Sequence, residues 1–173
     1  MTASARIPLM NKRPINLIAL VVCLLCTVAV APHFHKQLSR PEKERLLDGS
    51  FKKVATTEAM PPKVKEAFAA ITGERSFALA NPGQKYQETD VVSEPGLPVR
   101  RLLFAGAKDD EWFVHYERGG IGHGDYIVVF KVDAQHAVQF LWGGAGFHGA
   151  KNLDELRKMV AAGQFSDDRA YSW

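Results

Sequence analysis

Residues 99–142, VRRLLFAGAKDDEWFVHYERGGIGHGDYIVVFKVDAQHAVQFLW, decide the fold of this chain. β-branched and aromatic residues are concentrated in four runs, and polar or glycine-rich turns separate them, as is typical of strands joined into hairpins. The runs are residues 100–105, 111–118, 126–132 and 137–142. The stretch therefore predicts an antiparallel meander of four strands.

The third run, residues 126–132, is the best candidate for a central strand. Tyr126, Val128 and Phe130 alternate with Ile127 and Val129, so both of its faces are apolar. A strand that is apolar on both faces is expected to be covered on both sides. The neighbouring strands are half polar, and we expect each of them to face water on one side.

Helices and shorter strands flank the meander. Ser39 and Glu42 have the spacing of a capping box that opens a short helix, and an apolar stripe after Pro61 predicts a longer helix. Asn152 is placed to cap a third helix, which Gly163 ends. Residues 51–57, 76–80 and 88–93 are candidates for short strands.

These elements predict an α+β fold. We expect one globular domain over residues 50–173, in which two helices pack on an antiparallel sheet, a meander of about four to six strands. The helix near Ser39 is assigned instead to a juxtamembrane stalk, residues 32–49.

The N-terminus predicts a membrane anchor. Residues 15–31 contain no charge and follow a short basic head, residues 1–14. Seventeen residues are slightly fewer than the roughly 20 that a helix needs to cross a bilayer. Because Pro32 follows the small residues at 29–31, an uncleaved anchor is favoured over a cleaved signal. We expect a single-pass protein with its C-terminal domain outside the cytoplasm; the alternative is a secreted or periplasmic protein.

The charge distribution argues against nucleic acid as a partner. Residues 1–45 carry seven Lys or Arg and two Glu, whereas the remainder carries 15 basic and 17 acidic residues. The globular part therefore lacks the basic surface that nucleic-acid binding requires. Cys23 and Cys26 lie inside the apolar segment, where a zinc or redox pair is not favoured.

A glycine motif follows the fourth run. Residues 144–149, GAGFHG, match the G-x-G-x-x-G pattern of dinucleotide-binding folds. That fold needs the last glycine packed in the helix and a further parallel strand, and this chain offers neither. We expect residues 143–149 to form a flexible strand-to-helix connection and no nucleotide to bind.

Two glycine loops predict where a ligand would lie. The first loop, residues 119–124, enters the third strand and the second leaves the fourth, so antiparallel geometry brings both to one end of the sheet. Spare glycine amides favour a weakly held anion such as phosphate or a carboxylate. The candidate ligand-binding residues are His123, Asp125, Gly146, His148 and Asn152.

The chemistry of the histidines leaves an enzyme as an alternative. His123 and Asp125 are an acid–base candidate pair, and His115, His123 and His148 would meet only if both loops fold onto the same end. No spacing enforces a metal site, and we expect no metal, no cofactor and no catalytic residue. The alternative function is a small hydrolase or metal-dependent enzyme that uses histidines in glycine-rich loops.

Aromatic residues exceed what one sheet face needs. The surplus predicts an interaction surface formed by Phe113, His115, Tyr171 and Trp173, unless the helices and the tail cover it. The sequence as a whole predicts a non-catalytic binding module of the cell envelope. Its expected partners are the lipid bilayer and another envelope protein.

Overall fold

The computed structural model describes residues 37–92 and 94–167. Within these ranges, no helix combines the length and the apolar character that crossing a membrane requires. The predicted anchor, residues 15–31, lies outside the described residues, as do the head and the first part of the stalk.

The predicted antiparallel meander is confirmed, and the short strand predicted within residues 51–57 pairs at its edge. Five strands lie in the order β1-β2-β3-β4-β5, and every neighbouring pair is antiparallel. The strands are β1 (Lys52–Val54), β2 (Arg100–Lys108), β3 (Glu111–Arg118), β4 (Gly124–Val132) and β5 (Val138–Gly146). Together with three described helices, the sheet makes the α+β fold that the sequence predicts.

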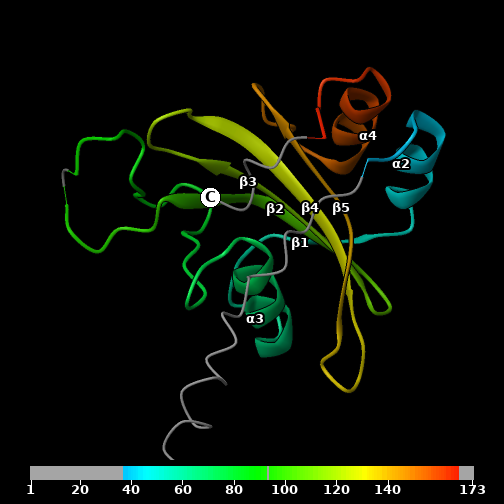
Figure 1. The fold of residues 1–173 in the computed structure, drawn as a ribbon, viewed down its shortest axis with the longest axis horizontal. Coiled ribbons are helices and arrows are strands. Elements are labelled where there is room, and N and C mark those ends of the chain that lie inside the picture. The colour runs from blue at the N-terminus through cyan, green and yellow to red at the C-terminus, as the bar shows by residue number, and fades with distance from the viewer. Residues whose placement is uncertain (1–36, 93, 168–173) are drawn as a thin grey trace, which may run out of the picture. The chain divides into compact units, whose positions relative to one another are not determined.

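One helix, α3 (Pro62–Ile71), covers the first face of the sheet, as Figure 1 shows. Its apolar stripe, which includes Val64 and Phe68, packs against alternate residues of β3 and β4. The Phe68 ring meets the Tyr116 ring edge-on at 5.2 Å. The stripe that the sequence shows after Pro61 is therefore the surface that closes this half of the core.

Two helices, α2 (Arg40–Leu46) and α4 (Leu153–Ala161), cover the second face (Figure 1). Leu156 and Val160 of α4 pack on Phe113 and Val129 of the sheet. Leu47, directly after α2, is completely buried in the same cluster. Residues assigned above to a stalk therefore belong to the domain, which packs three helices on its sheet and not two.

The capping signals are confirmed at both of these helices. The Ser39 amide donates a hydrogen bond to the Glu42 carboxylate over 2.8 Å at the start of α2. The Asn152 side chain accepts one from the Glu155 amide over 2.9 Å at the start of α4. Both contacts satisfy amides that the helix itself leaves without partners.

The expectation that the neighbours of β4 face water on one side is wrong for β3. Phe113, Val114, His115 and Tyr116 are all buried, so β3 is covered on both faces. The reason is that α2 and α4 lie over the face that carries Phe113 and His115. β4 is an interior strand buried on both faces, as predicted, while β3 holds the middle position because β1 extends the sheet.

The glycine-rich segment after Trp142 is strand and not loop. β5 runs through Gly146, and its glycines pair with β4, Gly144 opposite Ile127 and Gly146 opposite Asp125. A Cβ on Gly144 would lie 3.1 Å from the Cβ of Phe165, and one on Gly146 would lie 3.0 Å from the Gln164 carbonyl. The glycines thus let the segment after α4 lie against β5, where Ser166 and Ala145 exchange two backbone hydrogen bonds.

The short strands predicted at residues 76–80 and 88–93 are absent from the described residues, apart from an isolated bridge between Ala80 and Arg101. This region is a long connection that packs across the end of β3. The Gly119 amide donates to the Val99 carbonyl at 2.9 Å, and the Gln87 amide donates to Pro98 at 2.8 Å. Its backbone groups are therefore satisfied locally instead of in a sheet ladder.

Candidate functional site

Three connections converge at one end of the sheet, which we call the loop end. They are residues 81–99 before β2, residues 119–123 between β3 and β4, and residues 147–152 between β5 and α4. The strand register fixes this, because Glu117 lies opposite Asp125 and Asp125 lies opposite Gly146. The prediction that both glycine segments reach the same end is confirmed.

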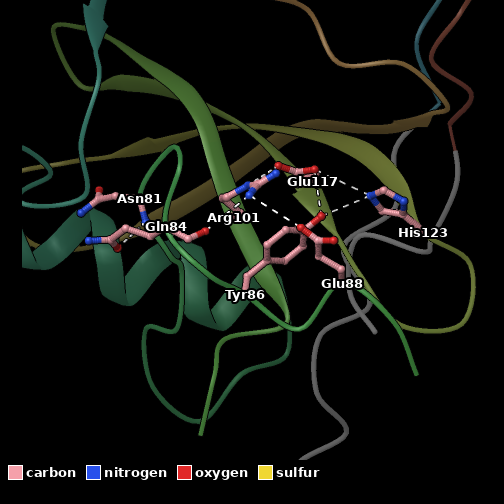
Figure 2. Close-up of polar contacts among 7 residues, drawn as sticks. All are labelled: Asn81, Gln84, Tyr86, Glu88, Arg101, Glu117 and His123. Carbon is pink, nitrogen blue, oxygen red and sulfur yellow. Dashed lines mark hydrogen bonds and ion pairs between the residues drawn. The ribbon is translucent and has the colours of Figure 1, made fainter. Parts of the chain in front are cut away.

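Glu117 is the hub of the polar contacts at the loop end, as Figure 2 shows. Its carboxylate accepts hydrogen bonds from the Arg101 guanidinium, on the neighbouring strand β2, and from the Tyr86 hydroxyl at 2.9 Å. The Arg101 guanidinium also lies over the Tyr86 ring, 4.3 Å from its centroid. An arginine held by both a carboxylate and a ring fixes three chain segments together.

His123 completes this group from the loop between β3 and β4. Its Nε2 lies 3.4 Å from the Tyr86 hydroxyl oxygen and 3.7 Å from the Glu117 carboxylate (Figure 2). Burial, with the Glu117 carboxylate beside it, raises the pKa of Tyr86, so the phenol stays protonated and donates. His123 itself is more than half exposed and closes the group toward solvent.

Asp125 is a half-buried carboxylate of this end that the group does not satisfy. Among the described residues, nothing donates a hydrogen bond to it, and the Gly149 backbone packs so closely that a Cβ there would lie 3.0 Å from its Oδ1. Burial, followed by the nearby Glu117 carboxylate, raises the pKa of Asp125 to about 6, and His123 and His148 offset this in part. A carboxyl group with that pKa changes charge close to neutral pH.

The structure gathers four of the five predicted ligand residues. His123, Asp125 and Gly146 lie at the loop end, and His148 lies near enough to act on the charge of Asp125. Asn152 is different, because its side chain is engaged as the cap of α4. Sequence reasoning did not single out Tyr86, Arg101 or Glu117 as members of this site.

Part of the basis for expecting an anionic ligand is absent. The Gly119 and Gly120 amides donate to the Val99 and Glu88 carbonyls, and the glycines of β5 lie within the sheet. These amides, which the sequence suggested were spare, are therefore used in the fold. Two carboxylates, Glu117 and Asp125, occupy the same end, and they favour a cationic group instead.

The predicted interaction surface is not where the sequence put it. Phe113 and His115 are buried beneath α4, Phe104 and Phe165. Tyr171 and Trp173 lie outside the described residues. The surplus of aromatic side chains is thus explained, at Phe113 and His115, by the second half of the core.

His115 has a structural role in this arrangement. The Ala150 amide donates to its Nε2 at 3.0 Å, so Nδ1 carries the proton and donates to the Tyr126 carbonyl at 2.9 Å. Burial lowers its pKa to about 4, and the ring is neutral at pH 7. His115 therefore joins β3, β4 and the start of the connection to α4, and it does not join His123 and His148 in a site.

Within the described ranges, no group of three or more His, Cys, Asp or Glu residues is arranged to hold a metal ion. Comparisons with protein-family models, with curated proteins and with solved structures found no match to this chain.

We expect Asp125→Asn to stabilise the protein at pH 7. A carboxyl pKa raised from 3.8 to about 6 means that the folded state holds its proton more tightly, so its ionisation costs stability as pH rises through this window. The shift corresponds to about 3 kcal/mol, which solvent screening at this half-buried position reduces to about 1–2 kcal/mol. Urea unfolding of parent and variant at pH 7 and at pH 3.5 measures the difference, which is expected to vanish at the lower pH.

The control is Asp90→Asn, which removes an exposed carboxylate from the connection before β2. It is expected to change stability by less than about 0.5 kcal/mol at either pH. A loss of stability in Asp125→Asn at pH 7 would show that the Asp125 carboxylate has a partner and that the site is misread.

Proposed function

We propose that this chain is a membrane-tethered binding module of the cell envelope, which presents its loop end to a partner outside the cytoplasm. The observation that carries the proposal is the Asp125 carboxylate. It is half-buried, has no hydrogen-bond donor in the described chain and carries a pKa of about 6. A group that costs stability in the free protein is retained most readily where a function needs it.

The surroundings of Asp125 support binding because they are held in place before any partner arrives. Glu117 ties β3 to β2 through Arg101 and to the preceding connection through Tyr86. Side chains that are already ordered lose little conformational entropy when a complex forms. A cation from a partner would supply Asp125 with an opposite charge, which His123 and His148 offer only in part.

The tether in this proposal is the charge-free run at residues 15–31, with the basic head on the cytoplasmic side. A tethered domain meets other proteins of the same membrane at a raised effective concentration, which favours a partner that is itself part of the envelope.

A second function is favoured by one observation. Asp125, with a pKa of about 6, and His123 at the same loop end are suited to exchange protons with a substrate near neutral pH. Binding has the better support because the polar groups beside His123 are already engaged. The Tyr86 hydroxyl donates to the Glu117 carboxylate, which also holds Arg101.

The proposal is tested with the full-length chain in its native membranes. We expect the chain to sediment with membranes and to resist an alkaline wash, and a deletion of residues 15–31 to release it. After mild detergent, the parent chain should migrate in a complex larger than its own micelle, and Asp125→Arg should dissociate that complex. Asp109→Asn, at the opposite end of β3, is the matched control. A parent chain that migrates alone would refute the proposal.

A further inference from the structure

We infer that the loop end docks a protein segment in which Lys or Arg side chains stand among apolar ones. This inference rests on the proposed function and names the class of partner for the same site. The apolar side chains of the partner would pack on exposed apolar side chains of the three connections. Its basic side chains would pair with the acidic groups among them.

Exposed apolar side chains gather at the loop end. The described part of the chain has five large hydrophobic residues with high exposure, and four of them lie on the three connections of the loop end. The fifth, Val138, lies at the other end of the sheet, at the turn between β4 and β5. Ile121 and Phe147 are 88% and 87% exposed, and Val91 and Val92 are 69% and 68% exposed. Single exposed hydrophobic residues are ordinary, but a group on adjoining loops marks an interaction site.

Contacts join the three connections that carry these residues. The Gly120 amide donates to the Glu88 carbonyl at 3.1 Å, which places Glu88 beside the loop that carries Ile121. Phe147 and the backbone of Gly122 line one hollow of about 260 Å³, together with His123. A hollow of that size accepts an apolar side chain from a partner.

The surface is formed in the free domain. The buried Gln87 side chain donates to the Thr89 carbonyl at 2.9 Å and to the Val91 carbonyl, and so fixes the turn that exposes Val91. The Gln87 backbone packs directly against Gly119, because a Cβ on residue 119 would lie 1.9 Å from the Gln87 carbonyl oxygen. Gly120 has a φ of +87°, which lets the chain turn back above this contact.

Acidic side chains outnumber basic ones on the three connections, where Lys85 is paired with Glu94 and Lys151 is exposed. Glu88 and Asp90 are exposed beside Val91, and Asp125 lies between the other two connections without a hydrogen-bond donor. Arg101 is already held by Glu117 and also lies 3.9 Å from the Glu88 carboxylate. An anionic bilayer surface would be repelled by these carboxylates, whereas Lys or Arg side chains of a protein would pair with them. The combination therefore favours a basic and apolar protein segment over lipid.

The test is site-specific photocrosslinking in cells with the full-length chain. A photoreactive phenylalanine analogue replaces Ile121, Phe147 or, as the matched control, Val138, and the crosslinked peptides are sequenced. We expect products at 121 and 147 but not at 138, and we expect the peptides attached at both positions to come from one segment with a net positive charge. Asp90→Lys should lower the yield at 121 and 147 about tenfold, and Glu66→Lys on α3 should not change it.

Other outcomes overturn the inference in distinguishable ways. Lipid adducts, or peptides without basic residues, at positions 121 and 147 would leave the loop end a binding surface for a different class of partner, and the proposed function would survive. Products only at Val138, or none at any position, would refute the inference and the proposed function together.

Discussion

We expect Phe130→Ala to destabilise the domain by about 3–5 kcal/mol, because it removes a large buried side chain and leaves a cavity. Phe130 is completely buried in the middle of β4. It lies opposite Trp112 on one side and Phe140 on the other, and it belongs to the cluster that α3 covers. Neither neighbouring strand can close the space without breaking its own pairing.

Chemical denaturation, followed by intrinsic fluorescence, measures this effect. The matched control is Phe147→Ala, the same substitution at a side chain that is 87% exposed, and it should change stability by less than about 0.5 kcal/mol. Equal unfolding midpoints for Phe130→Ala and the parent would contradict the position of β4 inside the sheet.

The second large effect is expected at His115. His115→Phe preserves an aromatic ring beside Phe104 and Phe165, whose centroids lie 5.3 Å and 5.8 Å from the imidazole. It leaves the buried Ala150 amide and the Tyr126 carbonyl without the two hydrogen bonds that the imidazole makes. We expect a loss of about 3 kcal/mol at pH 7, since each unsatisfied buried group costs about 1–3 kcal/mol.

The same variant should change the response to acid. The pKa of His115 is lowered from 6.5 to about 4 in the folded protein, so between these values the unfolded chain binds a proton that the folded chain does not. Stability that is present above pH 6.5 is therefore lost as pH falls toward 4, by on the order of 3 kcal/mol. His115→Phe lacks this contribution, and its stability should approach that of the parent at pH 4.

Unfolding curves at pH 7.5, 5.5 and 4 measure both parts of this prediction. His136→Asn removes an exposed histidine at a position with φ +66°, which asparagine tolerates, and it should leave the acid response of the parent intact. A constant stability difference between His115→Phe and the parent over this pH range would show that His115 takes up a proton in the folded state.

The meander and the helices could be predicted because their signals are local. The apolar alternation of residues 126–132 and the stripe after Pro61 appear in the structure as β4 and α3. Asn152 and Glu42 sit at the helix starts that their side chains indicate. Such signals depend on a few neighbouring residues and need no knowledge of the rest of the chain.

The polar group at the loop end could not be predicted, because a β-bulge creates it. Counting from the pair Lys108 and Glu111, an unbroken ladder would put Leu102 opposite Glu117. The register shifts near Leu103, and Arg101 takes that place instead. A one-residue shift of this kind leaves no signal in the alternation of a strand as apolar as β2.

A second bulge has the same effect on the glycines. The register between β4 and β5 shifts near Leu141, which brings Gly146 opposite Asp125. The sequence pattern suggested a loop because glycine is rare inside strands. The glycines belong to β5 because Phe165 and Ser166, from beyond α4, need the space beside them.

His115 shows a different limit of sequence reasoning. A histidine between Phe113 and Glu117 resembles a polar position on a solvated face. Its two partners, Tyr126 and Ala150, come from β4 and from the connection to α4. Only the folded chain brings them together, and burial of a polar ring follows from contacts that are distant in sequence.

The most direct test of the loop end as a binding surface is amide hydrogen exchange of the full-length chain, compared between native membranes and purified detergent micelles. We predict that residues 88–92, 119–124 and 146–149 exchange more slowly in the native membranes, where the partner is present, and that α3 and the β4–β5 turn near His136 exchange equally in both. Equal exchange at the three connections, or protection confined to α3 or to that turn, would contradict the account.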